Sequence, residues 1–130
     1  MFRRCGALLL VLLGCAAVAQ AHHSFAVFFS EGHLTTVRGK VTAFQFRNPH
    51  GLIRIEASGE GFQGGDWRAE TNSPSILERR GWSRDSLKVG DEIIIEGWPA
   101  RDGSRYMRMR KVTRADGTPV GRPIDFVEQQ

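Results

Sequence analysis

The chain has 130 residues, of which 41% are hydrophobic and 25% are charged, and its formal net charge is +4. This composition is too apolar for a disordered chain, and the length is too short for two independent hydrophobic cores. Fifteen glycines and five prolines favour short elements joined by turns, because both residues interrupt helices. These features argue against a helical bundle, and they exclude collagen, a coiled coil and a multidomain protein.

Residues 1–21 have the composition of a secretory signal peptide. Arg3 and Arg4 give a positive start, an apolar run of leucines follows, and the segment ends in small residues up to Ala21. The apolar run is too short to span a bilayer. We therefore predict cleavage near Ala21, a periplasmic or secreted location, and a mature chain of residues 22–130 with no transmembrane segment.

Removal of this segment changes the chemistry available to the rest of the chain. The formal net charge falls from +4 to +2 when Arg3 and Arg4 are lost. Both cysteines, Cys5 and Cys15, are lost as well, so the mature domain has no disulfide and no thiolate. Two alternatives remain: Leu12-Leu13-Gly14-Cys15 resembles a lipobox, which would give a lipoprotein anchored at Cys15, or the apolar run stays as an uncleaved anchor.

The first half of the mature chain predicts three strands. Residues 36–46 are rich in β-branched and aromatic side chains, with Gly39 as a bulge or bend. Residues 51–57 and 66–71 alternate between apolar and polar side chains, as half-buried strands do. The glycine-rich segment 59–65 between these two strands is a turn. The two strands are therefore predicted to form a hairpin.

The pattern then changes to that of a short helix followed by two strands. Ser73 suits an N-cap, Pro74 the first helical position, and Gly81 a C-cap, which predicts about two turns of helix. Residues 92–98 and 105–114 are the last two strands, joined by a turn at Arg101-Asp102-Gly103. In the final strand, alternation places one set of side chains on one face (Met107, Met109, Lys111) and another set on the opposite face (Tyr106, Arg108, Arg110, Val112).

This order of elements predicts an all-β, OB-fold-like small barrel of five strands, with the helix between strands 3 and 4. Glycines at the corners let coiled strands bend between the layers of such a barrel. An immunoglobulin-like sandwich needs about seven strands, which this chain does not supply. We treat residues 22–130 as one domain with a loose N-terminal arm and a C-terminal tail.

Several short motifs along the mature chain occur together in the same order. They are Ala21-His22-His23-Ser24-Phe25, Gly39-Lys40-Val41, Asn48-Pro49-His50, Trp67, Glu70, Ser73-Pro74, Leu77, Gly81-Trp82, Leu87, Gly90-Asp91 and Pro99-Ala100-Arg101-Asp102-Gly103. With them the chain resembles a family of small exported bacterial proteins that is a domain of unknown function. The resemblance covers nearly the whole mature chain and implies no activity.

The topology of the predicted barrel indicates a ligand-binding face. OB-like barrels contact ligands through the loop after the first strand, the loop between the last two strands, and the adjacent sheet. These regions contain Asn48, His50 and Arg101, with Trp67 nearby, so we expect ligand binding there. An arginine beside aromatic surface suits an anionic or polar ligand. The alternative is that Arg101 is solvated or paired with Asp102 at an ordinary turn.

Three histidines could hold a metal ion after signal cleavage. Cleavage after Ala21 would give His22 a free amine beside its imidazole, and His23 and His50 would add further nitrogens. Nitrogen-rich sites of this kind suit copper(II), and cleavage after Ala19 would place His22 third, which also suits copper. The alternative is that the paired histidines are a polar chain start and that His50 fixes a turn.

Two further surfaces carry weaker signals. The last strand is basic (Arg105, Arg108, Arg110, Lys111, Arg114), which predicts a solvated face or one that meets anionic lipid or polysaccharide. Export and the modest mature charge argue against nucleic acid as a partner. The aromatic segment 25–29 is expected to pack on its own domain, or else to form an exposed apolar arm that docks a partner.

No catalytic constellation is visible in the sequence. No serine occupies a nucleophile turn, and no phosphate-binding glycine loop precedes a helix. The leading hypothesis is a monomeric, non-enzymatic exported module that binds a small ligand or an envelope protein. The second is a periplasmic copper-type metal-binding protein, and the third is a structural envelope protein without a small ligand.

Overall fold

The computed structural model describes residues 25–124 of the chain. The predicted signal peptide and lipobox, and the predicted metal ligands His22 and His23, lie outside the described residues. Within the described part, none of the helices has the length and apolar character needed to cross a membrane.

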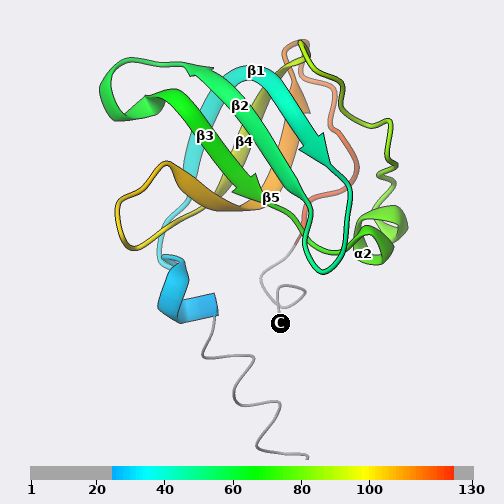
Figure 1. Cartoon of the computed structure of the whole chain (residues 1–130), viewed down its shortest axis with the longest axis horizontal. Helices are drawn as coiled ribbons and strands as arrows, with labels where there is room; N and C mark the ends of the chain where they lie inside the picture. Colours follow the sequence, from blue (N-terminus) through cyan, green and yellow to red (C-terminus); the bar gives the residue numbers. More distant parts are fainter. Residues whose placement is uncertain (1–24, 125–130) are drawn as a thin grey trace, which may run out of the picture.

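Five strands close into a barrel (Figure 1). Its elements in chain order are β1 (Thr35–Gln45), β2 (Leu52–Ser58), the 3₁₀-helix η1 (Gly61–Gln63), β3 (Gly64–Glu70), α2 (Pro74–Arg79), β4 (Glu92–Pro99) and β5 (Tyr106–Arg114). Neighbouring strands follow the order β1-β2-β3-β5-β4, and β4 pairs back onto β1. The β3–β5 pair is parallel and the other four pairs are antiparallel. The predicted OB-like barrel, with one short helix between strands 3 and 4, is confirmed.

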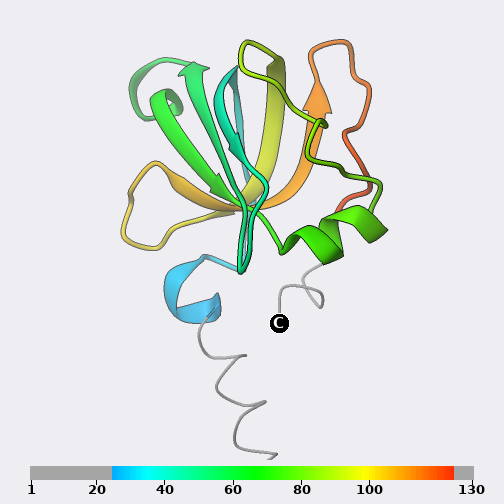
Figure 2. The same ribbon diagram turned by 45° about the vertical axis from the view of Figure 1, so that its right-hand side comes forward.

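Alternation of buried and exposed side chains along the strands builds much of the core. In β2, Ile53 and Ile55 are buried, whereas Arg54 between them is exposed. Each buried aliphatic side chain of this size contributes about 1.5–3 kcal/mol through removal of its surface from water. Leu77 of α2 joins the same core, and Figure 2 shows α2 beside the lower end of the barrel. The helix therefore closes the core at that end.

Gly39 has a different role from the one predicted. The irregularity in β1 lies between Val41 and Ala43, so Gly39 is not the bulge. Gly39 instead pairs with Ala57 of β2 on one side and with Ile93 of β4 on the other. A Cβ atom there would overlap backbone atoms of β2. Glycine is therefore required by close approach of the strands.

A bulge in β5 changes the predicted division of its side chains between two faces. Lys111 pairs with Glu96 and Met109 pairs with Gly97, so Arg110 is the extra residue. Met109 and Val112 consequently both point into the core, although simple alternation assigns them to opposite faces. The prediction of a solvated basic strand is also wrong at one position, because Arg108 is buried.

The arm before β1 packs on the barrel. Residues 25–28 form a helical turn, and Phe29 makes an isolated bridge with Ala100. Phe25 and Phe29 form a small apolar cluster with Trp98, and Phe25 meets the Trp98 ring edge-on, with 5.7 Å between centroids. Phe28 is outside this cluster and is 64% exposed. Of the two expectations for this segment, packing holds for Phe25 and Phe29, whereas Phe28 stays at the surface.

Candidate functional site

A cavity of about 530 Å³ lies between the arm and the barrel. Figure 2 shows the helical turn of the arm below the barrel, at the end where the β1–β2 and β4–β5 loops also lie. The wall consists of arm residues and of the β4–β5 loop, and the floor consists of polar side chains from the β1–β2 loop, β3 and β5. The lining residues are Phe25, Val27, Phe28, Phe29, His50, Glu70, Ala100, Arg101, Asp102, Tyr106 and Arg108.

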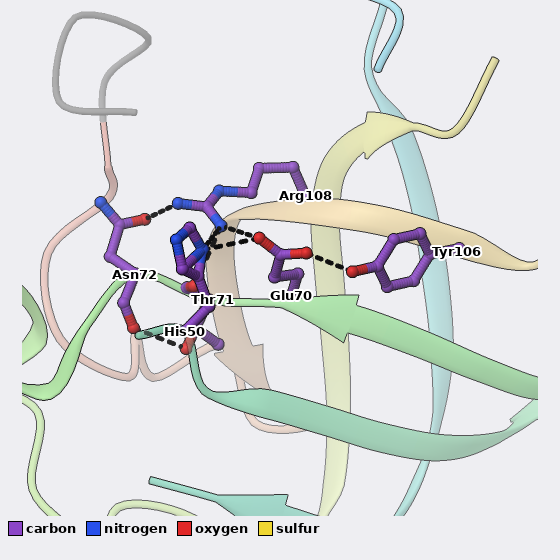
Figure 3. A network of polar contacts seen from close by, with 6 residues as sticks. All are labelled: His50, Glu70, Thr71, Asn72, Tyr106 and Arg108. Atoms are coloured by element: carbon purple, nitrogen blue, oxygen red, sulfur yellow. Dashed lines mark hydrogen bonds and ion pairs between the residues drawn. The ribbon is translucent and has the colours of Figure 1, made fainter. Parts of the chain in front are cut away.

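Arg108 is the centre of the floor (Figure 3). Its side chain is only 4% exposed, and it donates to a Glu70 carboxylate oxygen, to the Asn72 side-chain oxygen at 3.1 Å and to the Thr71 carbonyl at 3.1 Å. Burial lowers the pKa of Arg108, and the Glu70 charge opposes that change. A guanidinium nevertheless stays protonated in proteins, so the cavity floor contains a buried, paired positive charge.

Glu70 joins Arg108 to Tyr106. Its Oε1 accepts from Arg108 and its Oε2 accepts from the Tyr106 hydroxyl. Burial raises the pKa of Tyr106, and both the hydrogen bond to Glu70 and the negative charge of Glu70 raise it further. Tyr106 is therefore a protonated donor at neutral pH. Both carboxylate oxygens of Glu70 are thus occupied by strong donors.

His50 covers this pair from the β1–β2 loop. Its Nδ1 lies 2.6 Å from Arg108 Nη1 and 2.6 Å from Glu70 Oε1, so the tautomer decides whether it accepts from Arg108 or donates to Glu70. Burial and then the Arg108 charge lower the pKa of His50 below its usual 6.5, against the opposing effect of Glu70. The imidazole is therefore neutral at pH 7. With 45% of its side chain exposed, His50 can also meet a ligand.

The backbone beside His50 explains its position. Gly51 accepts a hydrogen bond from the Thr71 backbone at 3.0 Å, which ties the β1–β2 loop to the end of β3. A Cβ atom at Gly51 would come within 2.6 Å of the Gln45 carbonyl and of the Thr71 hydroxyl. Only glycine allows this close approach, so His50 is held over Glu70.

The four sequence-predicted ligand residues divide into two pairs. His50 and Arg101 line the same cavity, as expected from the barrel topology, and ligand binding by them stays a prediction. The prediction that Trp67 contacts a ligand is wrong. Trp67 is 1% exposed, lies on the inward face of β3, and donates to the Phe62 carbonyl at 3.3 Å. Asn48 is exposed and is not among the described residues that line the cavity.

Arg101 makes hydrogen bonds to the arm, which neither of the two alternatives considered from the sequence, solvation or pairing with Asp102, had predicted. Its Nε donates to the Ala26 carbonyl at 2.6 Å and to the Phe29 carbonyl at 3.0 Å. Its backbone N–H also donates to the Phe28 carbonyl at 2.9 Å. Arg101 therefore holds the arm against the β4–β5 loop and positions the aromatic wall of the cavity.

Sequence reasoning missed the ion pair of the floor. Glu70 and Arg108 are direct partners in the parallel β3–β5 register, two residues along from the pair Arg68 and Tyr106. Opposite charges at facing positions of neighbouring strands stabilise each other. The OB-like strand order places the third strand beside the fifth, so the usable signal was an acidic residue at the end of one strand and a basic residue early in the other.

The described residues do not supply a set of metal ligands. Within residues 25–124, no group of three histidine, cysteine or acidic side chains is arranged to hold a metal ion. Nδ1 of His50 faces the Arg108 guanidinium, which disfavours a second cation at that atom. Because His22 and His23 lie outside the described residues, copper binding at the N-terminus stays a prediction.

Fold and site define a small OB-like barrel with a lateral cavity, whose floor is a buried arginine–carboxylate pair. The chain belongs to a family of unknown function, DUF6152, whose model matches residues 10–108. The expected resemblance to a domain of unknown function is thereby confirmed. No protein with a curated functional description matches the chain.

Two solved structures of TiaS are similar to part of the chain. The first, a ZRD-deleted mutant of TiaS in complex with agmatine, is 16% identical with a TM-score of 0.46, over 63% of this chain and 21% of that chain. The second, apo TiaS, a tRNAIle2 agmatidine synthetase, is 17% identical with a TM-score of 0.44, over 63% of this chain and 18% of that chain. The chain thus spans about a fifth of their length, and this likeness carries no argument about function.

Proposed function

We propose that the protein is an exported, monomeric binding module without catalytic activity, and that it holds a small ligand in the cavity between the arm and the barrel. The observation that carries the proposal is the polar floor under an aromatic wall. The floor is already assembled by Arg108, Glu70 and Tyr106, so binding requires little reorganisation there. A concave, mostly apolar site with a few fixed polar groups is the usual form of a small-molecule site.

The lining residues favour a particular kind of ligand. Phe28 and Phe29 supply apolar surface for an aromatic or aliphatic body, and His50 supplies a neutral polar contact at the floor. The charges of the described lining balance, because two arginines (Arg101, Arg108) face two carboxylates (Glu70, Asp102). A neutral or zwitterionic molecule with one hydrogen-bonding end therefore fits better than a multiply charged one.

The contacts within the floor support binding over proton-transfer catalysis. An efficient general acid or base has a pKa near the working pH and is within reach of the proton it transfers. Both oxygens of Glu70 accept hydrogen bonds, from Arg108 and Tyr106, and the pKa of Tyr106 is raised well above neutrality. These groups hold one another in place, which suits a rigid recognition surface.

Export rests on the sequence of residues 1–21 and has its own test. Intact mass measurement of the protein from the periplasmic fraction should show a chain that begins near His22. A mass that includes lipidated Cys15 would instead support the lipoprotein alternative. A full-length chain recovered from the cytoplasm would contradict the export proposal.

The ligand proposal is tested with protein purified from its native compartment without denaturation. Small molecules released from the wild type by organic solvent are identified by mass spectrometry and titrated back by calorimetry. Phe28→Ser removes exposed cavity wall, and Val89→Ser, an exposed apolar residue elsewhere, is the matched control. We expect binding to weaken at least about tenfold in Phe28→Ser and to persist in the control. Equal binding by both variants would refute the cavity as the site.

A further inference from the structure

A second hollow lies on the outer face of the barrel, over β2 and β3. It also has a volume of about 530 Å³. Four arginines line it (Arg47, Arg54, Arg68, Arg105), against one carboxylate, that of Asp66. We call this hollow the arginine groove. Among the described residues, it shares no lining residue with the cavity between the arm and the barrel.

Like charges face each other at directly paired positions along the groove. Arg54 of β2 and Arg68 of β3 are direct partners in the antiparallel register, and the next outward pair is Glu56 with Asp66. Like charges at facing positions destabilise a sheet. Asp66 relieves part of this by pairing diagonally with Arg54 at 2.6 Å. The remaining excess of positive charge is a stability cost that an anionic ligand would offset.

Two of the groove arginines are held in place by the protein. The Arg68 guanidinium lies over the Tyr106 ring, 5.1 Å from its centroid. Arg105 donates to the Phe62 carbonyl at 3.2 Å and to the Gly61 carbonyl at 3.1 Å, and its guanidinium lies over the Phe62 ring. Ordered guanidinium groups lose less entropy when they bind a carboxylate or sulfate.

The same contacts decide which polyanion fits. In OB-folds, the face of strands 2 and 3 binds oligonucleotides or oligosaccharides. Single-stranded nucleic acid is bound by stacking its bases on exposed aromatic rings. Here an arginine guanidinium already lies over the Tyr106 ring and another over the Phe62 ring, so those two ring faces are not available for stacking a base.

We propose that the arginine groove binds an acidic oligosaccharide, whose carboxylates or sulfates contact Arg54 and Arg68. This site goes beyond the proposed cavity ligand and does not depend on it. Bidentate hydrogen bonds from guanidinium groups to planar carboxylates provide the recognition. The sugar ring needs only a polar, hydrated groove, which the exposed outer face of β2 and β3 supplies.

The test measures binding of tetragalacturonate to the purified protein by calorimetry at low and high salt. The neutral tetrasaccharide maltotetraose and a ten-residue oligothymidylate are titrated in parallel. The groove variant is the double substitution Arg54→Gln and Arg68→Gln. Its matched control, Lys88→Gln with Lys111→Gln, changes the net charge equally at exposed positions outside the groove.

Tetragalacturonate is expected to bind the wild type and the control alike, and to lose at least about tenfold in affinity in the groove variant. Asp66→Asn removes the groove carboxylate and should strengthen binding, which gives a test that does not rely on loss of function. Binding should also weaken as salt is raised. An equal loss in the control variant, equal binding of maltotetraose, or tighter binding of the oligothymidylate would overturn the proposal.

Discussion

Replacing Glu70 by glutamine tests whether the cavity floor is held by a buried charge pair. The substitution preserves the size and shape of the side chain and removes only its negative charge. The Arg108 side chain is 4% exposed and that of Glu70 is 23% exposed. The variant therefore leaves a guanidinium charge in a poorly hydrated site without its counter-charge.

The expected cost follows from the degree of burial. Breaking a fully buried ion pair costs about 3–5 kcal/mol. Water reaches part of Glu70, and the Thr71 carbonyl and Asn72 side chain still accept from Arg108, so we expect about 2–3 kcal/mol. For a domain of this size, that corresponds to a fall in Tm of about 8–24 °C.

Urea unfolding followed by tryptophan fluorescence measures this change. The matched control is Glu96→Gln, which breaks the ion pair between Glu96 and Arg110, an arginine on the same strand as Arg108. Both side chains of this pair are about one-third exposed, so the substitution should cost less than about 1 kcal/mol. Adding Arg108→Met to Glu70→Gln should recover about 1–2 kcal/mol, because it removes the unpaired charge. The reasoning fails if Glu70→Gln costs no more than Glu96→Gln.

Three further predictions concern single histidines and glycines. Folding lowers the pKa of His50 below 6.5, so the unfolded state binds the extra proton as the pH falls. Stability should therefore decrease as the pH drops below about 6.5, and His50→Asn should flatten this slope in urea unfolding measured across the pH range. Gly39→Ala should lower the free energy of unfolding by about 2–3 kcal/mol, since its Cβ would overlap β2 backbone, whereas Gly32→Ala has open space and should change it little. Calorimetric titration of the processed protein with copper(II) should show a site lost in His22→Ala; unchanged affinity would remove the metal hypothesis.

Local sequence patterns were enough to predict the elements of the barrel. Alternation around Ile53 and Ile55 and the Ser73-Pro74 helix start depend on residues next to each other in the chain, and the structure contains both elements. Because the strand order follows from the element order, the topology also placed His50 and Arg101 beside one cavity.

The contacts inside the site could not be predicted, because they depend on strand register and on a bulge that local sequence patterns do not determine. The pairing of Glu70 with Arg108 requires the parallel β3–β5 register, and the inward turn of Val112 requires the bulge at Arg110. Trp67 was misplaced for a different reason: the apolar face of its alternating strand packs into the core, which removes Trp67 from any ligand-binding surface. Register and facing are global properties, so a single local pattern leaves them open.

The position of the arm links the predicted processing site to the cavity. Phe25 and Phe29 are anchored on Trp98 and by the contacts of Arg101, and they begin four residues after Ala21. The first described residues of the predicted mature chain therefore form one wall of the cavity. A signal peptide removed a few residues later would take that wall with it, so the site of cleavage and the integrity of the cavity are coupled. Arg101, predicted as a ligand contact, acts in this arrangement as the residue that fixes the wall.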